Sequence, residues 1–232
     1  MPRIYLIRHG QASFMKDNYD QLSTLGIQQS LKLGQYLRER SIQFDHALVG
    51  TMQRQIDTMK SCLGDQAGDN FSENSVFNEH EGPAVFKAYF PKAMEKNQPL
   101  ALKLKEKGID DPANRKALIK VFYKIHQDWT ADLVPSGEHE TWAQFRLRIR
   151  DQAFKVLEKE LQKHDNIVVF SSGGVIATII GEILGLSDAK IVELNWEIKN
   201  TAVSTLKYSN GKWKLHDFNN TAHLQDDEIS FV

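Results

Sequence analysis

Positions 4–10 of the chain read Ile4-Tyr5-Leu6-Ile7-Arg8-His9-Gly10. The four apolar residues form a continuous run, which predicts a short strand buried on both faces, as in a parallel sheet. The Arg-His-Gly tripeptide follows at the C-terminal end of that strand, where open α/β sheets bind their ligands. An arginine offers planar donors to an anion, a histidine can act as nucleophile or proton carrier, and a glycine lets the backbone turn close to a ligand. We therefore expect a sheet strand that ends at an anion site.

Beyond this stretch, the apolar spacing alternates between helix and strand. It predicts a helix over 23–40, a strand over 44–49 and a second helix over 52–63. Arg54 lies one turn into that second helix, again beyond the end of a strand. Two guanidinium groups aimed at one crevice would repel strongly unless an anion lay between them. Arg54 is therefore a second candidate anion ligand, beside Arg8.

The C-terminal half resumes the same alternation. We expect a long amphipathic helix over 142–161, a buried strand over 166–171 and an apolar helix over 175–184. Ser187 caps a short helix, and Asn210-Gly211 joins two strands, 201–208 and 212–218, into a hairpin. Residues 219–232 are interpreted as a tail. The fold class is α/β: an open, mostly parallel sheet with helices on both faces.

The middle of the chain has a different pattern. Residues 65–135 show no clear strand and are interrupted by five prolines, at 83, 91, 99, 112 and 135. One helix is predicted over 114–129, because apolar residues recur there at helical spacing: Leu118, Phe122, Ile125 and Trp129. We interpret residues 65–135 as a helical cap inserted into a single domain that spans 1–232.

Composition excludes several classes of function. A chain of 232 residues and 26.5 kDa fits one large domain, and its net charge of -1 gives no general attraction to nucleic acid or an acidic membrane. Cys62 is the only cysteine, so no intrachain disulfide forms. No signal peptide or membrane span is recognisable. We expect a cytoplasmic protein with no nucleic-acid or membrane partner. The sequence leaves its oligomeric state open.

Six segments, in this order, resemble the histidine phosphatase superfamily, also called the phosphoglycerate mutase-like family. They are Arg8-His9-Gly10, Leu22-Ser23-Thr24-Leu25-Gly26-Ile27-Gln28-Gln29, Gly50-Thr51-Met52-Gln53-Arg54-Gln55, Phe77-Asn78-Glu79, Pro135-Ser136-Gly137-Glu138 and Ser171-Ser172-Gly173-Gly174-Val175-Ile176. The matches cover most of the chain.

The resemblance implies phosphoryl transfer in two steps. His9 would attack phosphorus, and water would hydrolyse the phosphohistidine, while Arg8 and Arg54 neutralise charge on the phosphoryl oxygens. Glu79 would act as general acid and then base, for which partial burial must raise its pKa. Glu81 and His80 lie close enough in sequence to be alternatives. The substrate would be a small phosphorylated metabolite or phosphopeptide, and we expect no metal and no cofactor.

The main departure from the family pattern is Ser172, which stands where a second histidine is usual. Its hydroxyl and the backbone amide of Gly173 can still donate to an anion, but neither supplies a positive charge. Replacing a charge-assisted hydrogen bond to the phosphoryl group with a neutral one would lower the rate about tenfold or more. His139 is a candidate replacement cation. The sequence therefore leaves open whether the activity is full, reduced or absent. In the last case the protein would bind a phosphorylated ligand as a regulator.

A second departure concerns the loop after His9. Gln11-Ala12-Ser13-Phe14-Met15 lacks the Glu-x-x-Trp-Asn continuation typical of sugar-phosphate mutases. This favours a phosphatase, with a mutase-type phosphotransferase as the alternative.

Three other enzyme classes fit the sequence less well. A serine-hydrolase elbow would need glycine at Phe170, and the glycines near 173 lack dinucleotide-binding spacing. Ala143 stands where a zinc protease would carry its second histidine.

Overall fold

A computed structural model describes residues 2–13, 20–64, 68, 70–107, 111, 114–134, 137 and 139–231. The chain divides into two compact units: residues 1–79 with 148–232, and residues 80–147. The first unit holds the sheet and the second is helical. The second contains most of the helices that the sequence assigns to a cap at about 65–135, and the cap role stays a prediction.

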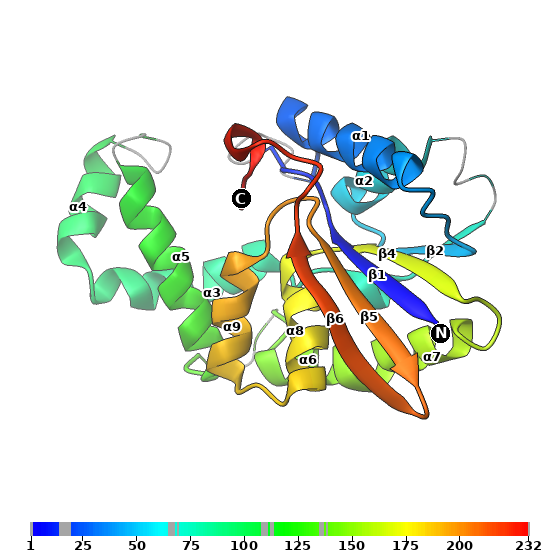
Figure 1. The fold of residues 1–232 in the computed structure, drawn as a ribbon. Helices are drawn as coiled ribbons and strands as arrows, with labels where there is room; N and C mark the ends of the chain where they lie inside the picture. The colour runs from blue at the N-terminus through cyan, green and yellow to red at the C-terminus, as the bar shows by residue number, and fades with distance from the viewer. Residues whose placement is uncertain are drawn as a thin grey trace. The chain divides into compact units, whose positions relative to one another are not determined.

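The six-stranded sheet has the order β3-β2-β4-β1-β5-β6. Its strands are β1 (Arg3–Arg8), β2 (His46–Val49), β3 (Phe71–Glu73), β4 (Asn166–Ser171), β5 (Val203–Ser209) and β6 (Lys212–Asn220). The pairs β3-β2, β2-β4 and β4-β1 are parallel, whereas β5 and β6 are antiparallel. Figure 1 shows β1 between β4 and β5, near the middle of the sheet. The expected open, mostly parallel sheet is confirmed.

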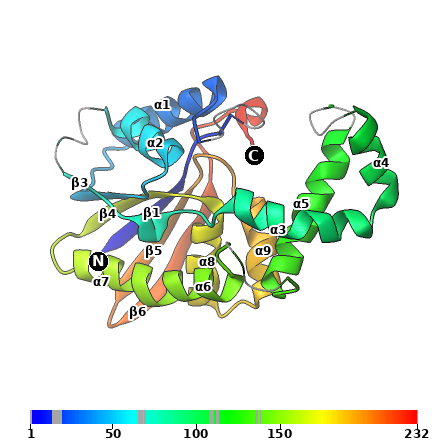
Figure 2. The ribbon, with the colours of Figure 1, turned by 180° about the vertical axis from the view of Figure 1, so that it is seen from behind.

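The central strands are buried on both faces, as their continuous apolar runs predict. Tyr5, Ile7, Val168 and Phe170 point to the face covered by α1 (Thr24–Glu39) and α2 (Gln53–Leu63). The alternate residues of β1 and β4 are also fully enclosed, and α8 (Gly173–Leu184) packs on β1 from the other face. Figure 2 shows these helices on opposite sides of the sheet. Because side chains of a strand alternate in direction, only a strand covered twice can be apolar throughout.

The other helix boundaries in this unit also follow the sequence. Ser23 caps α1 by accepting a hydrogen bond from the Gly26 amide at 3.0 Å. A short helix, α9 (Asp188–Glu197), begins after Ser187. Asn210 and Gly211 both have positive φ, 53° and 71°, as a tight hairpin between twisted strands requires.

The long helix expected over 142–161 forms as three consecutive segments. They are α6 (Trp142–Arg148), a π-helical turn (Ile149–Ala153) and α7 (Phe154–Glu160). A π turn adds a residue to the helical repeat and re-aims the side chains beside it. The Arg148 guanidinium, just before the turn, donates to the carbonyls of Val76 and Asn78 at 2.8 and 3.0 Å.

The expectation that residues 65–135 hold no strand is wrong. Phe71–Glu73 form β3, which pairs in parallel with β2 at the edge of the sheet. A 3-10 turn, Ser75–Phe77, follows. Three residues are too few for an alternating pattern to be recognised. Pairing with a neighbouring strand therefore determines the conformation here.

The second unit contains α3 (Gly82–Glu95), α4 (Gln98–Lys107), α5 (Arg115–Thr130) and most of α6. The predicted helix over 114–129 is thus confirmed. Its end carries Trp129, whose ring lies 4.4 Å from that of His80 and 5.3 Å from that of Trp142. These buried rings form the centre of this unit.

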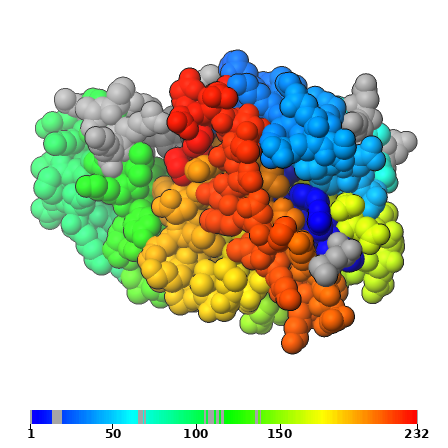
Figure 3. All heavy atoms as spheres, viewed as in Figure 1, coloured from blue at the N-terminus to red at the C-terminus, as the bar shows by residue number. Residues whose placement is uncertain are grey.

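The C-terminal segment, residues 221–231, is not a detached tail. Gln29 of α1 donates to the Glu228 carbonyl at 2.7 Å and to the Ser230 hydroxyl at 2.9 Å. Lys32 forms an ion pair with Glu228. Figure 3 shows the segment in red directly beside the blue atoms of α1. Because these contacts are made by polar groups, the spacing of apolar residues in the sequence does not predict them.

His223 in this segment makes stability depend on pH. Burial lowers its pKa from 6.5 to about 4. Its Nε2 bonds the Thr201 hydroxyl at 2.9 Å, while its buried Nδ1 has no hydrogen-bond partner among the described residues, so a proton added there would be unsolvated. Unfolded chains bind that proton below pH 6.5, and folded chains bind it only near pH 4.

We therefore expect the free energy of unfolding to fall by up to about 3 kcal/mol as pH decreases from 6.5 to 4. The His223→Gln variant should lack this part of the slope in urea titrations at pH 7, 5.5 and 4. Parallel slopes for the two proteins would contradict the assignment.

No helix in the described parts of the chain is long and apolar enough to cross a bilayer. The Cys62 thiol is buried, which raises its pKa to about 12 and makes it inert as a nucleophile.

Candidate active site

His9 lies just beyond the end of β1, with its ring buried and its tautomer defined. Its Nδ1 is 2.8 Å from the Gly10 carbonyl oxygen. A carbonyl only accepts, so Nδ1 carries the proton and Nε2 keeps a lone pair. The Arg54 Nε–H donates to that Nε2 at 3.2 Å. The free lone pair of His9 therefore faces a cation.

Burial, Arg54 and Arg8, in that order, hold the pKa of His9 well below its usual 6.5. The ring is thus neutral near pH 7, and its Nε2 is able to attack an electrophile. For a reaction in which Nε2 is the nucleophile, we expect the acid limb of log kcat/KM that belongs to His9 to lie below pH 6.5, because a proton on Nε2 removes the attacking lone pair. Stopped assays from pH 4 to 8 would measure it, and an acid limb at 6.5 or above would contradict this prediction.

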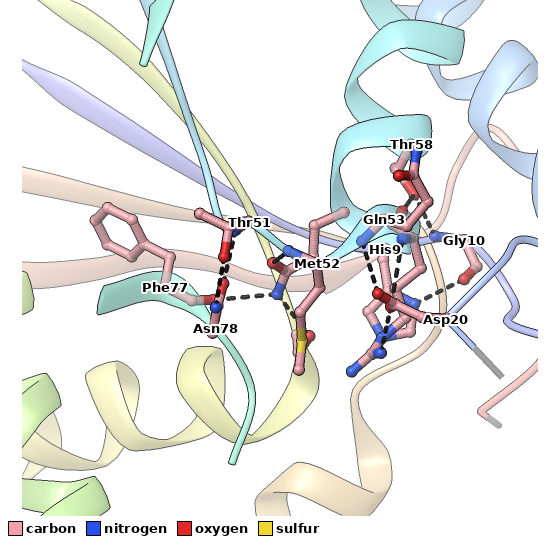
Figure 4. A network of polar contacts seen from close by, with 12 residues as sticks. His9, Gly10, Asp20, Thr51, Met52, Gln53, Thr58, Phe77 and Asn78 are labelled. Carbon is pink, nitrogen blue, oxygen red and sulfur yellow. Dashed lines mark hydrogen bonds and ion pairs between the residues drawn. The ribbon is translucent and has the colours of Figure 1, made fainter. Parts of the chain in front are cut away.

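Arg54 is held at the start of α2 by Asp20. Its Nη1 donates to Asp20 Oδ1 at 2.7 Å, and the same carboxylate accepts the Gln53 amide at 2.8 Å. A carboxylate at a helix N-terminus satisfies an unpaired amide and the helix dipole. Figure 4 shows Asp20 beside His9 and Gln53. The guanidinium can thus face His9 and Asp20 at once.

The turn after His9 is tightly packed against both covering helices. A Cβ on Gly10 would collide with the Gly26 carbonyl oxygen of α1. The Gly10 amide donates to the Thr58 hydroxyl at 2.9 Å, and that hydroxyl donates to the Arg54 carbonyl at 2.6 Å. Only glycine fits here, and Thr58 fixes the distance between the His9 turn and α2.

A second polar support holds the His9 turn from the other side. The Asn200 amide, fully buried, donates to the His9 carbonyl at 3.1 Å. Ser230 of the C-terminal segment donates to Asn200 Oδ1 at 2.9 Å. The segment therefore supports the residue that carries the candidate nucleophile.

Arg8 and Glu79 both meet the start of α8. The Arg8 guanidinium donates to the Ile198 carbonyl, and its Nε and Cζ lie 3.5 and 3.6 Å from where a Cβ of Gly173 would be. Glu79 Oε2 accepts the Gly174 amide at 2.8 Å. A side chain on Gly174 would displace that carboxylate. The glycines thus let a cation and an acid approach the helix N-terminus.

Ser172 caps the same turn and is fully enclosed. Its hydroxyl accepts a hydrogen bond from Gln55 Nε2 at 2.8 Å. The position that usually carries a histidine in the resembling family is therefore filled by a serine with an amide partner.

All six predicted site residues belong to the first unit and are linked by contacts within one region: Arg8, His9, Arg54, Glu79, Ser172 and Gly173. His80, Glu81 and His139 belong to the second unit. There His80 packs among aromatic rings, and the His139 ring lies 5.6 Å from Tyr89, edge-on. Phe14, Met15 and most of the segment 135–138 lie outside the described residues.

Asp20, Gln55 and Asn200 were missed by the sequence analysis. Gln55 follows Arg54 directly, and Asn200 precedes the hairpin, but neither position has a recognisable signal. Across the described residues, no group of three or more His, Cys, Asp or Glu side chains is arranged to hold a metal ion.

The site combines a neutral, deprotonated imidazole nitrogen, two arginines, a carboxylate and a helix N-terminus. Cations and backbone amides stabilise the charged oxygens of an anion such as a phosphoryl group, and the imidazole lone pair can attack its electrophilic central atom. The carboxylate can exchange a proton with a leaving or attacking oxygen. This set of groups suits transfer of a phosphoryl group.

Comparisons with known proteins agree with this arrangement. A sequence profile of the histidine phosphatase superfamily (branch 1) matches residues 4–85 and 106–221. A 2,3-bisphosphoglycerate-dependent phosphoglycerate mutase of Bacteroides fragilis is 25% identical, over 84% of this chain and 83% of its own.

Solved structures share the fold. A mutant phosphoserine phosphatase from Entamoeba histolytica, in complex with phosphoserine, has a TM-score of 0.64, 20% identity, and coverage of 97% of this chain and 100% of its own. The alpha-ribazole phosphatase of Shigella flexneri has a TM-score of 0.63, 20% identity, and coverage of 95% and 97%.

Proposed function

The chain belongs to the histidine phosphatase superfamily, and from that premise we propose that it hydrolyses a small phosphomonoester through a phosphohistidine on His9. The observation that carries the proposal is the His9 ring: Nδ1 bonds the Gly10 carbonyl, and Nε2 faces Arg54. A histidine held in this tautomer directs its lone pair at an anion bound by the arginine.

In the first step, Nε2 of His9 attacks phosphorus in line with the ester oxygen, and the P–O bond breaks. Arg8 and Arg54 balance the charge on the equatorial oxygens. The Gly173 amide and Ser172 hydroxyl donate to the same group in this proposal. In the second step, water attacks phosphorus, His9 leaves with its lone pair, and inorganic phosphate is released.

Glu79 is proposed to give its proton to the leaving oxygen and then to take one from water. We expect Glu79→Gln to lower kcat/KM, which reports only the first step, about 10²-fold on an alkyl phosphate, since the amide cannot transfer a proton. The loss should be much smaller on p-nitrophenyl phosphate, whose leaving group needs no proton. Equal losses on both substrates would assign the acid role elsewhere, with His80 and Glu81 the next variants to make.

A panel assay tests the proposal as a whole. Phosphate release is measured with p-nitrophenyl phosphate, phosphorylated metabolites and phosphopeptides, with and without EDTA, and with the His9→Ala protein as background. We expect turnover of at least one monoester that EDTA leaves unchanged. Turnover equal to background on every substrate would refute the phosphatase and leave a phospho-ligand binding protein, which inorganic phosphate titration would identify.

A mutase-type phosphotransferase is the second candidate, because a relative that matches 84% of this chain is a 2,3-bisphosphoglycerate-dependent phosphoglycerate mutase. Both activities share the phosphohistidine and differ in the acceptor. Transfer of label from the enzyme to a second hydroxyl rather than to water would favour the mutase.

A further inference from the structure

The buried side chain of Gln55 connects three segments that carry the candidate active site. It belongs to α2, directly after Arg54, and has no exposed surface. Its Nε2 donates to the Phe77 carbonyl at 3.1 Å and to the Ser172 hydroxyl at 2.8 Å. Phe77 lies two residues before Glu79, and Ser172 begins the turn into α8. One amide therefore joins the elements of Arg54, Glu79 and Gly173.

The orientation of this amide is determined by its partners. The Phe77 carbonyl can only accept, and the Met52 N–H, which donates to Gln55 Oε1 at 3.4 Å, can only donate. Figure 4 shows Met52, Phe77 and the neighbouring Thr51–Asn78 pair around this network. The two protons of the Gln55 amide nitrogen are therefore donated to the Phe77 carbonyl and to the Ser172 hydroxyl.

These contacts define the role of the Ser172 oxygen. It accepts the Gln55 proton, so the proton of the hydroxyl itself points away from Gln55. The Phe77 carbonyl is already shared by Gln55 and the Ser171 hydroxyl, the latter at 2.7 Å, and takes no third donor. The Ser172 proton is thus left for another acceptor.

Gln55 is closely surrounded on the side that faces Ser172 and Gly50. Ser172 is fully enclosed, and a Cβ on Gly50 would collide with Gln55 Oε1 and lie 2.8 Å from Asn78 Oδ1. Interiors this closely packed resist larger side chains. The Gln55 amide lies 2.8 Å from the Ser172 oxygen, so a larger side chain that leaves position 172 in the same direction would meet Gln55.

We propose that Gln55 is a positioning residue that acts through Ser172: it holds the serine oxygen as an acceptor, so that the hydroxyl proton is directed to a phosphoryl oxygen. This inference rests on the proposed phosphoryl transfer. Positions 55 and 172 work as a pair, and one cannot change without the other.

A double-mutant cycle on p-nitrophenyl phosphate tests the pair. Gln55→Met keeps the volume and removes the hydrogen bonds, and Ser172→Ala removes the hydroxyl. Each should lower kcat/KM about tenfold, and the double variant should be no slower than Ser172→Ala alone. Lys60→Ala, on the exposed side of the same helix, is the control and should match wild type. Losses that multiply in the double variant would overturn the proposal.

A second experiment tests the same pair by thermal stability, without measuring turnover: it enlarges the side chain at position 172 and shortens the one at position 55. Ser172→His should lower Tm by at least about 4 °C, because the imidazole collides with Gln55. Adding Gln55→Ala should restore most of that loss. Equal Tm values for Ser172→His with and without Gln55→Ala would show that the two positions do not share space.

Inorganic phosphate separates failure of this inference from failure of the proposed function. Calorimetric titration should show about fivefold weaker binding for Gln55→Met and for Ser172→Ala, and no further loss in the double variant. If the wild type turns over no substrate, the phosphatase is refuted while this cycle still measures the coupling. Phosphate affinity unchanged in both single variants would overturn the inference, whatever the turnover.

Discussion

His9→Ala is expected to lower kcat by about 10⁴-fold or more, to the background of the assay. Removal of a nucleophile eliminates the covalent route, and the remaining groups only bind and polarise the substrate. Labelled substrate should leave no label on the variant in a rapid quench, whereas wild type should carry it on histidine.

The fold should survive this change, because His9 is held by its backbone. Its amide donates to Ser171 and its carbonyl accepts from Asn200 and Thr201. Arg8 and Arg54 remain, so phosphate affinity should stay within about threefold of wild type. A variant that retains a tenth of the wild-type kcat with intact Tm would exclude His9 as nucleophile.

Arg54→Met is expected to lower kcat about 10³-fold, the second largest effect. The substitution removes a buried cation that faces Nε2 of His9. Loss of one preorganised group that stabilises an oxyanion typically lowers kcat by about 10²–10³-fold. Arg54→Lys should recover little. A single ammonium cannot reproduce the fork that reaches His9 and Asp20 together.

The pH profile gives Arg54 a signature that misfolding would not produce. Arg54 is the largest charged contributor to the low pKa of His9. Without it, that pKa should rise, and the acid limb of log kcat/KM should move to higher pH. Arg40→Met, which removes an exposed arginine stacked on Tyr36, is the control and should leave the limb in place. An unmoved limb in Arg54→Met would contradict the electrostatic role.

The fold was predictable wherever the pattern was long and apolar. The apolar residues of β1 and β4 and residues 173–181 of α8 are buried, so their sequences show burial directly. β3 was missed because its three residues depend on pairing with β2. The π turn within the helix from Trp142 was missed because one additional residue hardly disturbs the apolar spacing.

The candidate site was predictable only where residues belong to recognisable motifs. Arg8, His9 and Arg54 follow strands, and their positions at the sheet edge follow from topology. Asp20, Gln55 and Asn200 contact the site from loops or helices, and their hydrogen bonds to Arg54, Ser172 and His9 span 34, 117 and 191 positions. No local pattern encodes such contacts, since they depend on the assembled sheet.

The docked C-terminal segment also determines when the site can be completed during synthesis. His9 leaves the ribosome early, but the Asn200 amide that supports it bonds Ser230, and Gln29 reaches Ser230 across 201 positions. A nascent chain that stops short of Ser230 lacks these contacts even when the strands have been made. His9, the candidate nucleophile, is therefore made well before the residue that completes its support, and ribosome-bound chains that lack Ser230 should be less active than chains that contain it.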